Sequence, residues 1–205
     1  MKTNLKNILL IATVLIFSVI KVHAQDEFVK RLSEARAAFA ANKLGDARFA
    51  MQQMMQEIDI NIGKSILKSL PLKVESWSVN TANDHVSGAS GFFGVVVHRD
   101  YGTIDSAGAP FYVEVINNSP VLVGLNALLS LPVMVNGDGR KVVKVAGYKA
   151  LIETSSNDFG PTGGHTLQIP VGSTLITLNL NKGTQDQLQK IAETLPVAEI
   201  AKLSQ

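Results

Sequence analysis

The spacing of apolar residues changes near Pro71, and this change constrains the fold more than any other feature of the sequence. Residues 26–69 contain no proline, and their apolar groups recur every three or four positions, which places them on one face of a helix. After Leu72 the apolar residues form short runs rich in Val, Ile, Thr and aromatic groups, separated by turn residues. Such runs are typical of strands, so the sequence predicts helices followed by a sheet.

Residues 42–46 are predicted to be a turn between two helices. The first helix has its apolar face on Phe28, Leu32, Ala35 and Phe39. The second has its apolar face on Met51, Met54, Met55, Ile58, Ile62 and Ile66. Asp46 is suited to cap the second helix. Because the turn is short, the two helices are expected to pack as an antiparallel hairpin.

The hairpin locally resembles one helical pair of the tetratricopeptide type. The resemblance rests on residues in both helices: Ala38, Phe39, Gly45, Asp46, Ala47, Ala50, Ile58 and Asp59. It covers the helical segment alone, and the sequence shows no second copy, whereas stacked repeats need about three units for stability. The resemblance therefore implies a helix–turn–helix shape and nothing about activity.

Seven strands are predicted after the hairpin. They are Leu72–Val79, Phe92–Arg99, Phe111–Asn117, Lys141–Ala146, Tyr148–Thr154, Thr166–Val171 and Thr174–Leu180. Most of the links between them are short, which favours an antiparallel meander over βαβ units. Gly147, between two of the runs, predicts either a tight turn or a bulge.

Two helices are expected to interrupt this sheet. Ser119 and Pro120 provide an N-cap and a first helical residue for Val121–Leu131, which is apolar nearly all round and is therefore expected to be buried. Thr184 and Gln187 have the spacing of a capping box. They begin a C-terminal helix that is expected to lie across the sheet and to be interrupted by a proline.

These elements predict an α+β fold. An N-terminal antiparallel helical hairpin at residues 25–70 is followed by a mainly antiparallel sheet domain at residues 71–205, with the C-terminal helix packed on the sheet. At 46% apolar residues the chain can bury a proper core, which excludes a disordered tail.

Residues 1–24 have the pattern of an export signal. A positively charged start precedes an apolar run at Ile8–Ile20, and Val22-His23-Ala24 forms a cleavage pattern before Gln25. The run is shorter than the roughly 20 residues of a membrane-spanning helix. We therefore expect cleavage, no stable membrane insertion afterwards, and a periplasmic or extracellular location. An uncleaved anchor is the alternative, because Lys21 lies between the run and the cleavage site.

Signal cleavage would remove the positive charge of the chain. The full sequence has 19 basic and 17 acidic groups, and losing Lys2, Lys6 and Lys21 leaves 16 basic groups and a net charge of −1. A nearly neutral protein gives no support to nucleic-acid or anionic-membrane binding. The absence of cysteine excludes disulfides, cysteine-ligated zinc, iron–sulfur clusters and thiol catalysis. No metal or cofactor is predicted.

His98 is the strongest candidate for catalytic chemistry. In an extended strand it shares a face with Asp100, and a neighbouring strand could bring Glu114 or Glu153 close to it. A carboxylate-paired imidazole is suited to acid–base catalysis. The alternative, a polar strand end that leads into solvent, is favoured because the sequence shows no second catalytic element.

The glycine-rich stretch Gly160–His165 is a candidate binding loop. It lacks the Lys-Ser/Thr ending of a phosphate-binding P-loop, and a strand rather than a helix follows it. We predict a flexible loop that starts at Ser155. Gly163, Gly164 and His165 are its candidate ligand residues.

Met51, Met54 and Met55 lie close together on the second helix. Their helical spacing favours ordinary packing between the hairpin and the sheet. The alternatives are a surface for an apolar protein partner and a Cu(I) site built from thioether ligands. Self-association through this helix would make the protein a homo-oligomer.

Two functions from different classes remain open. The first is an exported, non-enzymatic binding or envelope-associated protein with a protein partner or a small ligand. The second is a small hydrolase or isomerase that uses His98 with Asp100 or Glu114. The enzyme predicts His98 in a concave, partly desolvated pocket, whereas the binding protein predicts an exposed apolar patch or a groove, most plausibly between hairpin and sheet.

Overall fold

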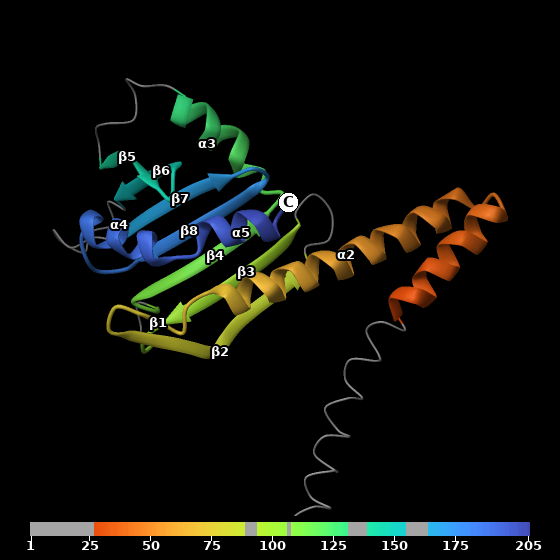
Figure 1. Ribbon diagram of the computed structural model, residues 1–205, viewed down its shortest axis with the longest axis horizontal. Coiled ribbons are helices and arrows are strands. Elements are labelled where there is room, and N and C mark those ends of the chain that lie inside the picture. The colour runs from red at the N-terminus through yellow and green to blue at the C-terminus, as the bar shows by residue number, and fades with distance from the viewer. Residues whose placement is uncertain (1–26, 89–93, 106–107, 131–138, 155–163) are drawn as a thin grey trace, which may run out of the picture. The chain divides into compact units, whose positions relative to one another are not determined.

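The computed structural model describes residues 27–88, 94–105, 108–130, 139–154 and 164–205 (Figure 1). The predicted signal peptide at residues 1–24 lies outside this set. The chain divides into one unit at residues 1–58 and another at residues 59–205. A helical pair, an antiparallel sheet and C-terminal helices make up an α+β fold, which confirms the predicted fold class.

The helical pair consists of α1 (residues 27–40) and α2 (Leu44–Ser69). Asn42 follows α1 with a φ of 56°, a left-handed conformation that ends helices. In the described part of the first unit the buried apolar side chains are three alanines: Ala35, Ala47 and Ala50. Alanine side chains are small, so there is little room between the two helices for larger groups. The larger apolar side chains of this unit are therefore more accessible.

The sheet has eight antiparallel strands in the order β1-β2-β3-β4-β8-β7-β6-β5. The strands are β1 (Lys73–Val74), β2 (Trp77–Gly88), β3 (Val95–Tyr101), β4 (Phe111–Asn117), β5 (Arg140–Val145), β6 (Tyr148–Thr154), β7 (His165–Val171) and β8 (Thr174–Leu180). The chain builds half of the sheet from β1 to β4 and then passes through α3 (Val121–Ser130) to the opposite edge. From β5 at that edge the chain runs back through β6 and β7 to β8, which pairs with β4.

The single strand predicted at Leu72–Val79 is wrong. Glu75 has a φ of 49°, and the chain reverses there to form a hairpin between β1 and β2. Strand β2 then continues through polar residues to Gly88. These residues lack the apolar alternation of a strand, and the last four of them, residues 85–88, pair with β3.

One face of the sheet, which we call the closed face, is covered by α4 (Gln185–Thr194) and α5 (Val197–Leu203) (Figure 1). Both helices contribute buried side chains to the main core, including Leu188, Ile191 and Ile200. The Thr184 hydroxyl accepts a hydrogen bond from the Gln187 backbone N–H at 3.1 Å, which confirms the predicted cap. The C-terminal helix therefore packs on the sheet as predicted.

The end of α2 also belongs to this core. Ile66 and Leu70 are buried with the closed-face side chains. Gly63 approaches the sheet so closely that a Cβ atom would lie 2.6 Å from Val95 and 2.7 Å from Val86. Such distances are far below van der Waals contact, so the close approach of this helix requires glycine.

Strand β2 contains a large bulge. Asn80 and His85, five positions apart, pair with Asp100 and His98, which are only two positions apart. The four residues 81–84 therefore lie opposite the single residue Arg99, three more than regular pairing would place there. A bulge of this kind redirects side chains and breaks the regular pairing of the strand.

The bulge supports a buried ion pair. Arg99 is buried, and its guanidinium donates to both carboxylate oxygens of Asp84, at 2.9 and 2.6 Å. It also donates to the Leu70 carbonyl at 3.0 Å. The hydrogen bond to Asp84 raises the pKa of Arg99 above its usual value. One side chain thus connects β3, the bulge and the end of α2.

Tyr101 is expected to make the fold sensitive to alkali. Its ring is fully buried, its hydroxyl donates to the Pro71 carbonyl at 2.9 Å, and burial raises its pKa from 10.0 to about 12. Because the folded state holds this proton more tightly than the unfolded state, the contribution is complete below pH 10. It declines as the pH rises through about 12, by about 2–3 kcal/mol. Urea unfolding across this range should show the loss, and Tyr101→Phe should reduce it; an unchanged pH dependence in the variant would contradict the assignment.

The opposite face of the sheet, the open face, carries α3 at one end. Leu122, Leu125 and Leu129 pack there against Leu151 and Leu175 of the sheet. The outer side of α3 is exposed, since its first and third residues are 50% and 80% accessible. The expectation that this helix is buried all round is therefore wrong, because the helix touches the sheet along one stripe. In the described part of the chain, no helix is both long enough and apolar enough to cross a membrane.

Candidate functional site

The open face carries two continuous cross-strand rows of side chains, which we call the polar rows. The first row comprises His85, His98, Glu114, Thr177 and Gln168, on β2, β3, β4, β8 and β7. The second row comprises Asn80, Asp100, Tyr112, Asn179, Thr166, Glu153 and Arg140, and it reaches β5. Alternate residues of a strand point to the same side, so the register places both rows on one face.

The residues between these positions point the other way. Val113, Leu167 and Leu178 are fully buried on the closed face, next to polar residues that are only half-buried. The sheet therefore has one apolar side under helices and one polar side that is accessible beyond α3.

The structure brings together the three residues predicted as a catalytic cluster. His98 Nε2 lies 3.0 Å from Asp100 Oδ1, and His98 Nδ1 lies 4.0 Å from Glu114 Oε2. Asp100 is buried and accepts a second hydrogen bond from the Asn83 amide at 2.8 Å. Glu153, the other predicted neighbour of His98, instead accepts from Arg140 at 2.7 Å.

The two ring nitrogens of His98 face two different carboxylates. An ionised carboxylate can only accept, so His98 donates its Nε2–H to Asp100 and turns Nδ1 toward Glu114. Glu114 therefore lies beside the nitrogen that a substrate would have to approach. Within the described residues, no group of three or more His, Asp or Glu side chains could hold a metal ion.

Tyr112 connects the two polar rows. Its ring lies 5.2 Å from the His98 ring, measured between centroids, and is tilted by 38°. Burial raises the pKa of Tyr112, and the charges of Glu114 and Asp100 raise it further. The phenol therefore stays protonated at neutral pH and can both donate and accept a hydrogen bond.

Asn179, at the centre of the second row, has an unsatisfied polar atom. Its Nδ2 donates to Thr166 Oγ1 at 3.1 Å, while its Oδ1 is buried and has no hydrogen-bond partner in the described part of the structure. Rotating the amide by 180° would exchange Oδ1 and Nδ2, and the nitrogen would then be the buried atom without a partner. An unpaired buried polar atom is costly and uncommon, and this one is shielded from solvent in the described structure.

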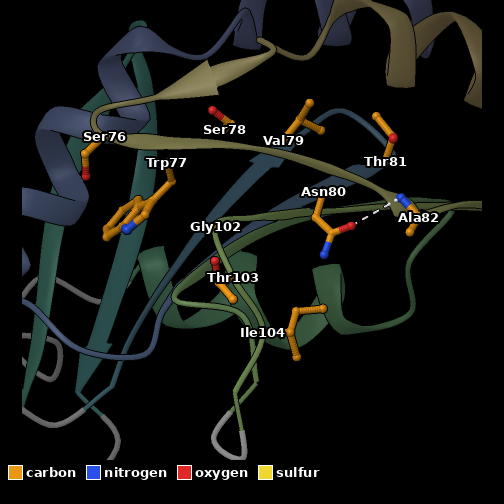
Figure 2. A pocket seen from close by; sticks show the side chains of 10 residues that line it. All are labelled: Ser76, Trp77, Ser78, Val79, Asn80, Thr81, Ala82, Gly102, Thr103 and Ile104. Atoms are coloured by element: carbon orange, nitrogen blue, oxygen red, sulfur yellow. Dashed lines mark hydrogen bonds between the residues drawn. The ribbon is translucent and has the colours of Figure 1, made fainter.

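The second polar row ends in a cavity of about 770 Å³ (Figure 2). Figure 2 shows Trp77 and Asn80 of β2, and Thr103 and Ile104 after β3, directed into the hollow. The Asn80 side chain accepts from the Ala82 backbone N–H at 3.2 Å within the same wall. The remaining lining residues are Ser76, Ser78, Val79, Thr81 and Gly102.

A smaller cavity of about 350 Å³ lies where α3 meets the sheet. Its helix side is Pro120, Val121, Gly124, Leu125 and Leu128, and its sheet side is Leu151, Glu153 and Gln168. Glu153 belongs to the second polar row, so this row runs from one cavity to the other. At about 4.8 Å per strand, the row covers about 24 Å between Asn80 and Glu153.

His165, predicted as a loop ligand residue, is buried at the start of β7 with both ring nitrogens engaged. Nε2 lies 3.2 Å from the Gly183 carbonyl and must carry the proton, so Nδ1 accepts from the Thr154 hydroxyl at 3.1 Å. The structure leaves neither nitrogen free for a ligand. Gly164 precedes this strand, and Gly163 lies outside the described residues.

The three methionines of α2 differ in accessibility. Met51 and Met55 leave 60% and 58% of their surface exposed, whereas Met54 is half-buried. Packing inside the helical unit therefore does not account for Met51 and Met55. Phe39 and Phe49 of the same unit are also exposed, so this part of the chain presents several large apolar side chains.

Comparison with known proteins gives little additional information. No family model matches the chain. No curated protein matches it either. Among solved structures, the chain is similar to a GTP binding regulator from Thermotoga maritima, with 10% identity, 66% of this chain and 88% of that chain covered, and a TM-score of 0.33. So remote a likeness carries no functional argument.

Sequence reasoning missed most of the polar rows. Tyr112, Thr166, Gln168, Thr177 and Asn179 all lie in predicted strands, at every second position between apolar residues. That alternation is the signal that could have identified them. It was not decisive, because the same pattern describes any strand with one solvated face.

Proposed function

We propose that this chain is an exported binding protein, in the periplasm or outside the cell, whose ligand surface is the open face of the sheet. The observation that carries the proposal is the second polar row, which runs between two cavities and contains a buried amide atom without a partner. Its ligand is proposed to lie on this face.

Three features distinguish the polar rows from an ordinary solvated sheet face. Most of their side chains are half-buried, whereas solvation alone would leave them exposed. Asp100 is buried and holds two hydrogen bonds on the same face, so part of the surface is preorganised. Asn179 has hydrogen-bonding capacity that the described protein groups leave unused.

Export is the part of the proposal that rests on residues 1–24. Their charged start, apolar run and Val22-His23-Ala24 pattern support cleavage before Gln25. The protein recovered from the periplasm or medium of an expressing bacterium should therefore begin at Gln25. Recovery of the intact N-terminus in the membrane fraction would support the uncleaved anchor instead.

Thr177→Lys is expected to abolish ligand binding. Thr177 lies between Glu114 and Gln168 in the first polar row, and a lysine there would extend over the open face. Thr194→Lys, at the exposed end of α4, is the matched control on the closed side. In a thermal-shift screen, a ligand at about 100 times its dissociation constant adds about 2.7 kcal/mol of stability. This shift should vanish in Thr177→Lys and persist in Thr194→Lys.

Two results would count against the proposed ligand surface. A thermal shift that survives Thr177→Lys would place the ligand elsewhere on the protein. No shift with any small molecule would favour a protein partner, for which the exposed Met51 and Met55 are the predicted contacts. A pull-down would then be the next experiment, and the mass in solution would test self-association.

The second candidate function is a small hydrolase or isomerase that uses His98. The 3.0 Å contact between His98 and Asp100 favours it, because a carboxylate orients an imidazole in many acid–base sites. Its weakness is that Glu114 faces the remaining ring nitrogen. Turnover that is lost in His98→Ala and is unaffected by Thr177→Lys would support the enzyme over the binding protein.

A further inference from the structure

The first half of α2 carries a row of exposed apolar side chains, which we call the α2 stripe. It consists of Leu44, Met51, Met55 and Ile58, whose exposed fractions are 58%, 60%, 58% and 40%. All four belong to the first unit of the chain. The buried alanines of α2 lie about a quarter of a turn away around the helix, so packing inside the helical pair leaves the stripe uncovered.

The spacing within the stripe is that of a contact between two helices. Its members follow one another at intervals of seven, four and three residues. Apolar residues with this seven-residue repeat lie along the line where one helix packs against another. At about 1.5 Å per residue the stripe is about 21 Å long. A second helix therefore matches this surface better than a small molecule does.

We propose that the chain forms a homodimer in which the α2 stripes of two copies pack against each other in antiparallel orientation. The charges beside the stripe indicate this occupant. Arg48 and Asp59 lie on the same margin of the stripe, within about 20° of each other around the helix. A twofold axis between residues 53 and 54 would place Arg48 of each copy opposite Asp59 of the other. The same axis would place Met51 of one copy beside Met55 of the other.

The pairing would use two charges that each copy leaves available. Among the described residues, neither Arg48 nor Asp59 has an ion-pair partner. Partial burial already raises the pKa of Asp59, so a guanidinium opposite it would offset a desolvation cost. In a parallel pair the two charged margins would lie on opposite sides of the contact, and these ion pairs would not form. The charges thus favour the antiparallel arrangement.

The test is the mass of the purified protein in solution, measured by sedimentation across concentrations at low salt. A contact this short belongs to the weak class of interfaces, so we expect dimers at about 100 μM and dissociation on dilution. Met55→Lys should raise the dimer dissociation constant by at least about tenfold, because it places an unpaired charge in the contact. Phe49→Lys is the matched control, since Phe49 is 60% exposed on nearly the opposite side of α2 and should leave the constant within about twofold.

A charge exchange tests the partner and the orientation together. Arg48→Asp should weaken the dimer about tenfold, since it places two carboxylates opposite each other at both ends of the contact. Adding Asp59→Arg to that variant should restore the wild-type constant to within about threefold. Circular dichroism of each variant verifies that the helices are retained, and the charge exchange decides the matter should Met55→Lys fail to fold.

Three results would overturn the homodimer: a monomer at every concentration, equal weakening by Met55→Lys and Phe49→Lys, or no recovery in the double charge variant. None of them bears on the proposed ligand surface, because α2 contributes no residue to the polar rows. Conversely, loss of ligand binding in Thr177→Lys should leave the dimer intact. The two proposals therefore stand or fall separately.

Discussion

Arg99→Ala should lower the free energy of unfolding by about 3–5 kcal/mol, because it leaves a carboxylate behind without its partner. In the native protein Asp84 accepts two short hydrogen bonds from the guanidinium, and the Leu70 carbonyl accepts a third. The alanine would remove all three and would open space beneath the bulge. Urea unfolding at neutral pH measures the change directly.

Arg140→Ala is the matched control for this prediction. Arg140 makes an ion pair with Glu153 at 2.7 Å, but its side chain is 49% exposed. Water and salt screen such a pair, so its loss should cost no more than about 1 kcal/mol. If Arg99→Ala and Arg140→Ala lowered the free energy of unfolding by similar amounts, the ion pair of Arg99 with Asp84 would not be shielded from water. A double variant, Arg99→Met with Asp84→Leu, should recover much of the stability because no unpaired charge remains.

Phe111→Ala should destabilise the sheet by about 3–5 kcal/mol. Phe111 is fully buried, its ring lies parallel to Trp77 with centroids 6.2 Å apart, and the Tyr101 ring lies 5.4 Å away on another side. Removing the ring leaves a cavity between groups that are held by strands β2, β3 and β4. Thermal or urea unfolding measures this loss.

Two companion variants identify the cause of the loss at Phe111. Phe111→Leu keeps most of the volume and should cost less than about 1.5 kcal/mol. Val123→Ala removes apolar atoms from a side chain that is 80% exposed on α3, and it should change stability by no more than about 0.5 kcal/mol. If Phe111→Leu were as harmful as Phe111→Ala, specific ring contacts rather than cavity formation would explain the effect.

Two local features of the chain were predictable because each depends on a few neighbouring residues. Thr184 caps α4 as its spacing with Gln187 indicated. Gly147 forms the tight turn between β5 and β6, with left-handed φ values of 49° and 87° at Ala146 and Gly147, and this excludes the alternative bulge within one strand. The α+β class followed from the same local signals.

Strand β2 and helix α3 were predicted less well, for opposite reasons. The polar residues after Asn80 show no strand pattern, and pairing with β3 keeps residues 85–88 extended. Helix α3 is apolar on nearly every side, and composition cannot indicate that the stripe with Leu122, Leu125 and Leu129 faces the sheet. In both cases the deciding partner lies elsewhere in the chain.

By itself the sequence determined the α+β class and the shared face of His98 and Asp100, since a strand places alternate residues on one side. The position of Glu114 opposite His98 could not be read from the sequence, because that contact depends on the register between β3 and β4. The same holds for the second polar row and for the unpaired amide of Asn179. Strand order is a property of the whole sheet, formed by contacts between distant segments, and no local pattern encodes it.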